Sequence, residues 1–282
     1  MYKIIDGRAL ADSIIEDVAK RIIENNLEPQ LAVVLVGGDS ASHIYVNLKE
    51  KACERVGIVF HKYLIDEDEK EEKILETIKF LNSDSNIDAV LIQLPLPTKI
   101  NQQKIIDALD YRKDVDGFHK KNIERMRQGK KQHILPGVSQ GIWKLIESTG
   151  ENAKDKETLI ISKSDEFSTL THIILRNNGL CVHCIKPDDP HLAEQTRIAD
   201  ILIPAVGEIN SITADMVKEG AIIIDVGINK KDGKTVGDVD FKNVAPKTSH
   251  ISPVPGGVGP MTVAMLLYNT MLLAKAKTAK LK

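Results

Sequence analysis

The segment Ser252–Thr262 constrains the fold of this chain more than any other. It reads Ser-Pro-Val-Pro-Gly-Gly-Val-Gly-Pro-Met-Thr. Prolines and glycines at this density exclude a helix or a central strand. Apolar residues flank the segment, with Ile251 before it and Val263 after it, so we expect the loop to pack against other parts of the protein. Its glycines would let the backbone approach a ligand or another domain closely, and the alternative is a rigid linker between two domains.

The chain before residue 118 alternates between two kinds of apolar pattern. Short continuous apolar runs are typical of buried parallel strands, which we expect at 30–36, 58–65 and 89–94. Helical spacing predicts helices at 8–26, 70–81 and 101–109. A further helix is expected to begin with Ser40 or Ser42 as its N-cap and to end at Gly57. This alternation predicts a parallel sheet with helices on both faces.

A second alternating series follows Gly117. It predicts helices at 122–128 and 141–147, strands at 158–162, 180–184, 200–206 and 221–226, and a small hairpin or loop at 233–241. A long helix at 261–280 closes the chain, and we expect its apolar face to return to the first domain. The fold class is therefore α/β, with two doubly wound domains of which the second is Rossmann-like. The predicted domains are 1–118 with 261–282, and 119–260.

Composition narrows the partners and the compartment. The net charge of −2 gives no reason to expect nucleic acid or an anionic membrane. No apolar run approaches the roughly 20 residues of a membrane span, and the N-terminus lacks the apolar core of a signal peptide. Three cysteines form no disulfide framework, which favours the cytoplasm. Cys181 and Cys184 have no second pair to complete a metal site, so we expect core residues and no metal.

Lys49 is the first candidate for chemistry. In the predicted helix after Ser42 it shares one face with Tyr45, Cys53 and Val56. Burial among such neighbours would favour the neutral amine and lower the pKa of Lys49. The alternative is a side chain whose stem packs on the helix while its amine stays in water.

Two further polar features lie at the ends of predicted strands. Gln93 is the one polar residue in the run 89–96, near the carboxyl end of a strand, where open parallel sheets bind ligands. Asp114-Val115-Asp116-Gly117 is a turn pattern with two carboxylates. Taken alone, this pattern is more often a plain turn than a site, but a carboxylate fixed at this edge could bind a nitrogen heterocycle through paired hydrogen bonds.

Several motifs together resemble the FolD family, the methylenetetrahydrofolate dehydrogenase/methenyltetrahydrofolate cyclohydrolases. They are Tyr45-x-x-x-Lys49, Gln93-Leu94-Pro95-Leu96-Pro97, Asp114-Val115-Asp116-Gly117 and the segment from Pro253 to Thr262, with support from Ala199-Asp200-Ile201, Gly220-Ala221, Asp225-Val226-Gly227-Ile228-Asn229 and Gly237-Asp238-Val239-Asp240. The similarity covers nearly the whole chain. It implies interconversion of 5,10-methylene- and 5,10-methenyl-tetrahydrofolate with NADP, then hydrolysis to 10-formyl-tetrahydrofolate in one-carbon metabolism and purine biosynthesis.

The resemblance also implies roles for individual residues. Lys49 matches the general acid/base or charge-stabilising group, and Gln93 matches the residue that orients it. Tyr45 matches the aromatic residue that packs along the folate, and Asp116 the carboxylate that binds the pterin. Pro255, Gly256 and Gly257 match the loop that closes over the folate in a cleft between the two domains. Ser162, Lys163, Ser164 and Ile228 match cofactor-binding positions, and the family's dimers imply a homodimer.

The cofactor half departs from the family pattern. Where the family has Gly-Arg-Ser-x-x-Val-Gly-x-Pro, this chain has Ser162-Lys163-Ser164-Asp165-Glu166-Phe167-Ser168-Thr169-Leu170. The glycines that let backbone approach a pyrophosphate are replaced by residues with side chains, and Asp165 and Glu166 add negative charge. Three other segments also differ: Lys186-Pro187-Asp188-Asp189, which should repel a 2′-phosphate, Pro136-Gly137-Val138-Ser139, and Ser252 in place of threonine.

These departures predict cyclohydrolase activity with weak or lost binding of NADP. Two other functions stay open. One is an ordinary bifunctional dehydrogenase/cyclohydrolase with an unusual phosphate loop. The other is a non-catalytic folate-binding scaffold, which would have no need to keep Lys49, Gln93 and Asp116 together.

Overall fold

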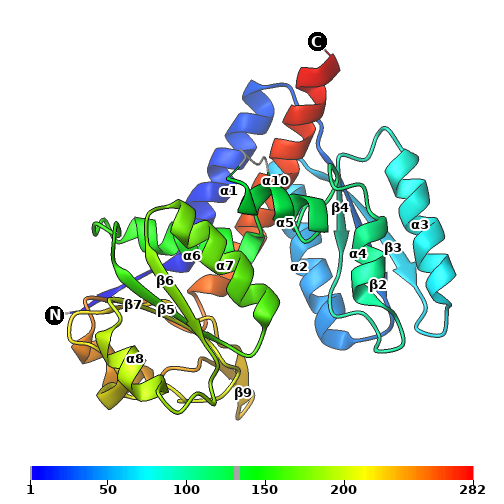
Figure 1. Cartoon of the computed structure of the whole chain (residues 1–282). Coiled ribbons are helices and arrows are strands. Elements are labelled where there is room, and N and C mark those ends of the chain that lie inside the picture. The colour runs from blue at the N-terminus through cyan, green and yellow to red at the C-terminus, as the bar shows by residue number, and fades with distance from the viewer. Residues whose placement is uncertain (1, 130–133, 282) are drawn as a thin grey trace. The chain divides into compact units, whose positions relative to one another are not determined.

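The computed structural model describes residues 2–129 and 134–281, which form two compact units (Figure 1). The first-sheet unit consists of Ser13–Gly137 with Val263–Lys282, and the second-sheet unit of Met1–Asp12 with Val138–Thr262. This division differs from the predicted boundaries in three places. Residues 1–12 and residues 261–262 group with the second sheet, and residues 119–137 group with the first.

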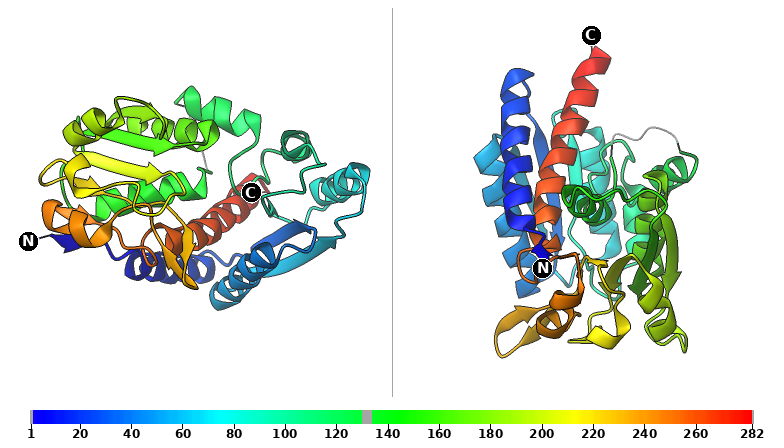
Figure 2. Two further views of the ribbon diagram at one scale, coloured as in Figure 1. Left: turned by 90° about the horizontal axis from the view of Figure 1, so that it is seen from below. Right: turned by 90° about the vertical axis from the view of Figure 1, so that its left-hand side faces the viewer.

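The first-sheet unit is built on three parallel strands, β2 (Gln30–Val36), β3 (Val59–Ile65) and β4 (Ala89–Ile92), in the order β3-β2-β4. The chain crosses from β2 to β3 in one direction and from β3 to β4 in the other. Right-handed crossovers therefore place α2 (Ser40–Val56) and α3 (Glu71–Ser83) on opposite faces, as Figures 1 and 2 show. A buried apolar cluster joins the sheet to α3 and to α4 (Gln102–Ala108).

Three more helices belong wholly or mainly to this unit. They are α1 (Gly7–Glu24), α5 (Lys120–Arg127) and α10 (Val258–Leu281), and α1 and α10 lie side by side in Figures 1 and 2. α10 begins at Val258, three residues before the predicted start. The exclusion of helix from this glycine- and proline-rich segment was therefore too broad, because proline is tolerated in a first helical turn, where Pro260 lies.

The second-sheet unit contains six parallel strands in the order β1-β11-β8-β7-β5-β6. Their bounds are β1 (Lys3–Ile4), β5 (Glu157–Ser162), β6 (Cys181–Ile185), β7 (Ile201–Ala205), β8 (Ile222–Ile223) and β11 (His250–Ile251). The other elements are α6 (Gly137–Ser148), α7 (Asp165–Asn177), α8 (Leu192–Ile198), α9 (Phe241–Val244), the 3-10 turns η1 (Ala214–Met216) and η2 (Ala245–Lys247), and the hairpin β9 (Asn229–Lys231) and β10 (Lys234–Val236).

The strand order of this sheet creates a switch point between β5 and β7. From β5 the chain moves to β6 on one side, and it then returns to β7 on the other side of β5. The connections therefore diverge beyond the carboxyl ends of β5 and β7. Open α/β sheets bind ligands at such a position.

Three local differences from the sequence predictions have physical causes. α2 is capped by Asp39, whose carboxylate accepts from Ser42 N at 2.8 Å, rather than by a serine. The strand predicted at 221–226 shortens to β8, where pairing with β11 ends because the Asp225 N–H donates to the Ser252 hydroxyl, although Ile224 and Val226 still donate to carbonyls of β7. Cys181 and Cys184 are exposed rather than core residues, because β6 is an edge strand.

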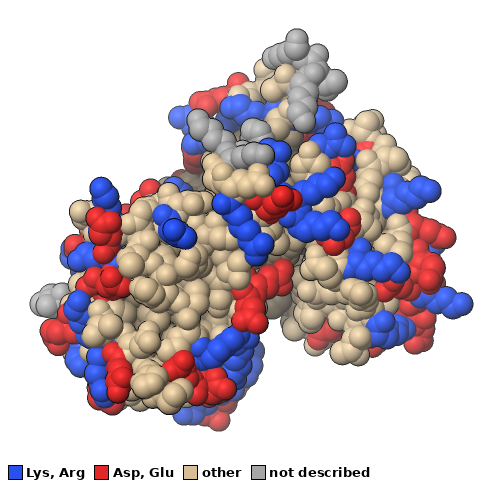
Figure 3. Space-filling model, in the orientation of Figure 1, with Lys and Arg blue, Asp and Glu red and all other residues tan. Residues whose placement is uncertain are grey.

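On the face drawn in Figure 3, Lys and Arg side chains are interspersed with Asp and Glu. Within residues 2–129 and 134–281, no helix is long and apolar enough to cross a membrane.

Candidate functional site

Lys49 and Gln93 meet at the carboxyl edge of the first sheet. The Lys49 amine, from α2, donates to Gln93 Oε1 at 2.8 Å, and Gln93 follows β4 directly. The Gln93 amide donates in turn to the Leu94 carbonyl at 2.7 Å, which fixes its oxygen toward the lysine. Burial lowers the pKa of Lys49, and the nearby charge of Asp116 partly opposes that shift. Lys49 is thus a desolvated amine with a fixed hydrogen-bond partner.

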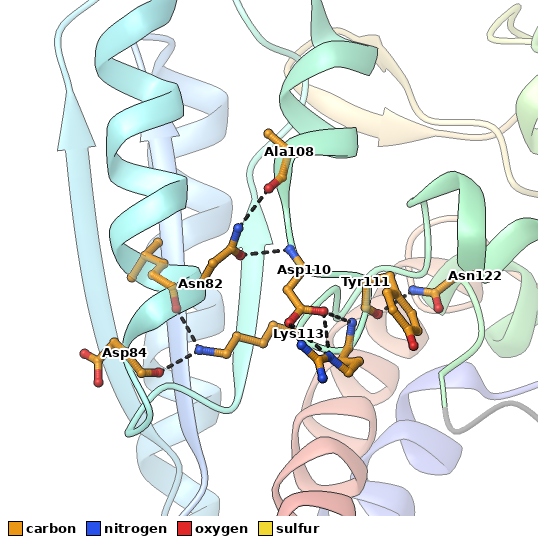
Figure 4. Close-up of polar contacts among 9 residues, drawn as sticks. Asn82, Asp84, Ala108, Asp110, Tyr111, Lys113 and Asn122 are labelled. Carbon is orange, nitrogen blue, oxygen red and sulfur yellow. Dashed lines mark hydrogen bonds and ion pairs between the residues drawn. The ribbon is translucent and has the colours of Figure 1, made fainter.

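The segment that carries Asp114 and Asp116 is anchored by a polar network (Figure 4). The Lys113 amine donates to the carbonyls of Leu81 and Asp84 at 2.7 and 2.6 Å. Asn82 accepts from the Asp110 N–H and donates to the Ala108 carbonyl, both at 2.8 Å. These contacts attach the segment to the end of α3, so its position is fixed before any ligand binds.

The two carboxylates of the Asp-x-Asp pattern have different environments. Asp114 is buried and accepts from the N–H groups of Gly117 and His119, at 3.0 and 2.8 Å, and from the Asn122 amide at 2.9 Å. Asp114 therefore builds the turn. Across the described part of the chain, no group donates a hydrogen bond to the half-buried Asp116 carboxylate. It lines a small cavity with Asp114, Phe118 and apolar side chains of β4 and α4.

The charge state of Asp116 follows from this environment. Burial raises the pKa of Asp116 to about 6, and the neighbouring Asp114 adds to the shift while Lys49 reduces it. Burial of a carboxylate that accepts no hydrogen bond lowers the free energy of unfolding. Such a group is typical of a ligand-binding position, because a ligand could supply the missing donors.

Tyr45 lies one helical turn before Lys49 on α2, with 47% of its surface exposed. Cys53 and Val56, further along the same face, are fully or almost fully buried. The stripe therefore runs from the core to the surface, with Lys49 between. An exposed aromatic ring next to a desolvated amine provides a flat apolar surface for a planar ligand.

Pro255, Gly256 and Gly257 belong to the second-sheet unit. Gly256 has φ +112°, and a Cβ at Gly257 would lie 2.7 Å from the Pro253 carbonyl oxygen, so both positions require glycine. Ser252, at the start of the loop, is buried, and its hydroxyl accepts from Asp225 N at 2.9 Å. A threonine hydroxyl could make the same bond, so this substitution preserves the anchor.

The switch point of the second sheet is closed by its own side chains. The Ser162 hydroxyl accepts from Ser164 N at 3.0 Å, and the Ser164 hydroxyl caps α7 by accepting from Phe167 N at 3.2 Å. The Lys163 amine pairs with Glu208 at 2.6 Å, which connects the segments that follow β5 and β7. Ser162 and Ser168, which replace the glycines of the family pattern, are both buried within the second-sheet unit.

The first turn of α7 carries further charge. Asp165 is highly exposed and pairs with Lys186 at 2.5 Å, while the Lys186 amine also donates to the Lys163 carbonyl at 2.9 Å. Asp189 accepts from His191 N at 2.8 Å, and Asp188 is exposed. Both lysines near the loop are thus engaged by carboxylates.

Two buried carboxylates that the sequence reasoning did not single out hold the neighbouring loops. Asp238 accepts from the N–H groups of Val206, Gly207 and Glu208 at 2.6 to 3.0 Å. Asp225 accepts from three further N–H groups, those of residues 227, 238 and 239. Their signal in the sequence is an aspartate within two residues of a glycine in each motif. Ile228 follows in this region and is 58% exposed.

Comparison with known proteins identifies two family models that match the chain. The model described as "Tetrahydrofolate dehydrogenase/cyclohydrolase, catalytic domain" matches residues 5–116. The model described as "Tetrahydrofolate dehydrogenase/cyclohydrolase, NAD(P)-binding domain" matches residues 136–278.

Individual relatives match over nearly their full length. "Bifunctional protein FolD" of Sulfurovum sp. is 43% identical over 280 residues, which covers 98% of this chain and 99% of the relative. The crystal structure of the bifunctional FolD enzyme from Campylobacter jejuni has a TM-score of 0.95 at 40% identity, covering 98% and 99% of the two chains. The Trypanosoma brucei enzyme complexed with NADP cofactor and inhibitor has a TM-score of 0.93 at 27% identity, covering 98% of each chain.

Proposed function

Because this chain belongs to the tetrahydrofolate dehydrogenase/cyclohydrolase (FolD) family, we propose that its main reaction is hydrolysis of 5,10-methenyl-tetrahydrofolate to 10-formyl-tetrahydrofolate. The observation that carries this proposal is the Lys49–Gln93 pair at 2.8 Å. The reaction adds water to an electron-poor carbon between two nitrogens and releases one proton. It therefore needs a base close to the attacking water.

Lys49 is suited to that task. A desolvated lysine with a lowered pKa has a larger neutral fraction near neutral pH than a solvated one. In the proposed reaction the neutral amine accepts a proton from the attacking water, and the water oxygen bonds to the methenyl carbon. The bond from that carbon to N5 then breaks as N5 takes up a proton and the new hydroxyl group loses its own, so N10 keeps the formyl group and one proton is released overall. Gln93 positions the amine through its fixed carbonyl oxygen.

Asp116 is proposed to bind the pterin. A pterin presents adjacent N–H donors, which match the two oxygens of a carboxylate that lacks protein donors. Tyr45 is proposed to pack along the planar part of the folate, and Pro255, Gly256 and Gly257 are proposed as folate-binding residues of the second-sheet unit. These assignments rest on the family motifs, together with the exposure of Tyr45 and the unpaired carboxylate of Asp116.

Replacing Asp116 by alanine is expected to weaken folate binding more than it slows hydrolysis of bound substrate. Hydrogen bonds to a charged group contribute about 1.5–3 kcal/mol each, so the dissociation constant should rise by at least about tenfold. Calorimetric titration with a folate substrate analogue measures the affinity, and single-turnover hydrolysis at saturation measures the chemistry. Unchanged affinity would show that the pterin is bound elsewhere.

The isosteric variant Asp116→Asn provides a matched control for folding. The folded-state pKa of Asp116, about 6, lies above the ordinary aspartate value of 3.8. The charged carboxylate therefore destabilises the fold fully above about pH 6, and this penalty disappears below about pH 3.8, where Asp116 is protonated in both states. Asp116→Asn should therefore stabilise the protein at pH 7.5, by about 1–2 kcal/mol after allowance for solvent screening. A variant that loses affinity while gaining stability has lost a binding group and not its fold.

We propose that the second activity of the family, NADP-dependent dehydrogenation, is weak or lost. The capped N-terminus of α7, the Lys163–Glu208 pair and the exposed Asp165 support this, because phosphates bind at helix N-termini that offer free N–H groups and positive charge. These residues do not fit a pyrophosphate. An ordinary bifunctional enzyme would require the loop to open and both lysines to exchange partners. A folate-binding scaffold would bind substrate without Lys49-dependent turnover.

We further propose that the protein is a homodimer formed through β3. This strand is an edge of the first sheet, and Val59, Leu64 and the nearby Phe80 expose 47%, 61% and 55% of their surfaces. Exposed apolar edge strands favour association with another strand. Leu64→Glu should convert a dimer to a monomer in light scattering, whereas Leu48→Glu, at an exposed position on α2, should not. A wild-type monomer would contradict the proposal.

A further inference from the structure

Three side chains of different types converge at the amino ends of β5 and β6, away from the features described above. In the parallel ladder Glu157 lies opposite Cys181, and His183 is two residues further along β6 on the same face. His183 Nε2 lies 3.6 Å from Cys181 Sγ and 3.3 Å from Glu157 Oε2. The three potential ligand atoms all lie within 4.8 Å of one another.

These separations match the edges of a tetrahedral metal site. Zinc bonds of about 2.3 Å to sulfur and about 2.0–2.1 Å to nitrogen or oxygen place neighbouring ligand atoms roughly 3.4–3.6 Å apart at the tetrahedral angle. The observed values of 3.3 and 3.6 Å differ from this by about a tenth of an ångström. These two edges, both from His183 Nε2, need little rearrangement to bind one ion, and the third edge, from Cys181 Sγ to the Glu157 carboxylate, is within 4.8 Å.

We propose that Glu157, Cys181 and His183 form a binding site for a borderline-soft divalent cation such as Zn²⁺, with water at the fourth position. A thiolate, an imidazole and a carboxylate are the ligand types that select zinc over magnesium or calcium. The thiolate and the carboxylate together balance the two charges of the ion. Binding releases the Cys181 proton to solvent and breaks no covalent bond other than that S–H bond.

The metal-free arrangement does not hold these groups strongly. His183 Nε2 contacts Glu157 Oε2 with side chains 60% and 50% exposed, and exposed polar contacts of this kind contribute at most about 1 kcal/mol. The thiol of Cys181 separates this site from a carboxylate-only surface site, because sulfur ligands favour zinc over magnesium or calcium.

The position of the site indicates a stabilising role rather than a catalytic one. Cys181 lies at the amino end of β6, whereas Ser162 and Lys186 lie at or beyond the carboxyl ends of β5 and β6. β6 is an edge strand with β5 as its single neighbour. An ion bound to both strands would join them by side-chain bonds in addition to the backbone ladder.

The test is titration of the reduced full-length protein with Co²⁺ and Zn²⁺. We expect one Co²⁺ to bind with a thiolate-to-cobalt charge-transfer absorption that Zn²⁺ removes, and Zn²⁺ to raise the melting temperature. Cys181→Ser should abolish the absorption and weaken Zn²⁺ binding by more than about a hundredfold, since loss of an outer-shell partner alone costs about 10–100-fold. Cys184→Ser is the matched control, because this exposed cysteine lies on the same strand and should leave both signals unchanged.

Two results would overturn the proposal. One is the absence of thiolate absorption in the wild type. The other is Zn²⁺ binding of equal strength in wild type, Cys181→Ser and His183→Ala, which would identify adventitious surface binding. Equal melting curves for the metal-free variants would show that the substitutions leave the fold intact.

Discussion

Replacing Lys49 by methionine is expected to slow hydrolysis of 5,10-methenyl-tetrahydrofolate by about 10²–10⁴-fold, the contribution typical of a positioned general acid or base. Methionine keeps most of the length and apolar character of the lysine stem in its partly buried position on α2. It removes the amine that donates to Gln93 at 2.8 Å. The loss of rate should appear in kcat, measured by the decay of methenyl absorbance at saturating substrate.

The control for this experiment is Lys62→Met, which removes a lysine that pairs with Glu50 of the same helix. It should leave the rate within about twofold, because an exposed pair contributes little to stability or to the site. Equal rates for wild type and Lys49→Met would remove Lys49 from the mechanism. A normal rate in Lys62→Met, which removes a lysine of β3 that contacts α2, together with a large loss in Lys49→Met would exclude a general effect of removing a positive charge next to α2.

Gln93 allows a finer test of the same assignment. If it positions the Lys49 amine, Gln93→Met should move the pH profile of hydrolysis as well as lower its maximum. The acid limb reports protonation of the base, and loss of the Gln93 carbonyl removes an acceptor that stabilises the ammonium form. The limb should therefore move to lower pH, whereas a purely structural defect would scale the whole profile.

The sequence predicted β2 and β4 of the first sheet well because these two strands are almost completely buried. β2 covers the predicted residues 30–36 and is almost completely buried, so its apolar run had no competing interpretation. The helix beginning after Asp39 was predicted with the wrong capping residue. Three side chains could serve as caps there, and sequence alone does not show which of them lies at the helix start.

The second sheet shows where sequence patterns reach their limit. The run that contains Cys181 and Cys184 predicted a strand, but not that it would lie at an edge, because strand order depends on contacts distant in the sequence. The pairing of Glu157 with Cys181 has the same origin. Likewise, the inward-facing hydroxyl of Ser162 could not be predicted, since only the fold shows that it accepts from Ser164 N.

The folate side and the cofactor side differ in how they could be predicted. Lys49, Gln93 and Asp116 lie on or next to regular elements, so their convergence at one sheet edge follows from a parallel topology. The loop after β5 is not held in place by the sheet topology in the same way. Its properties depend on side chains such as Glu208, which lies 45 residues beyond Lys163 in the chain and pairs with it across the switch point.

The purified protein is expected to show little or no NADP-dependent oxidation of 5,10-methylene-tetrahydrofolate. Lys163 and Lys186 are engaged by Glu208 and Asp165, and Ser164 already caps α7, so a pyrophosphate finds few free donors. Loss of several phosphate contacts amounts to several kcal/mol, and about 1.4 kcal/mol is tenfold in affinity. Direct titration of the protein with NADP and with NAD measures the effect without dependence on turnover.

Restoring the family residues should reverse this loss, which makes the cause testable. A variant with Ser162→Gly, Lys163→Arg, Phe167→Val and Ser168→Gly should bind NADP at least about tenfold more tightly than the wild type. Asp165→Asn alone should give an increase of up to about fivefold, because freeing Lys186 from an exposed pair is worth at most about 1 kcal/mol. Glu194→Gln, which breaks a comparable exposed contact to His191, is the control and should change nothing.

Asp188 should oppose a 2′-phosphate, so any residual activity of the wild type should favour NAD. Robust NADP turnover by the wild type would contradict this account, because it would require the loop to open and its lysines to exchange carboxylates for phosphates.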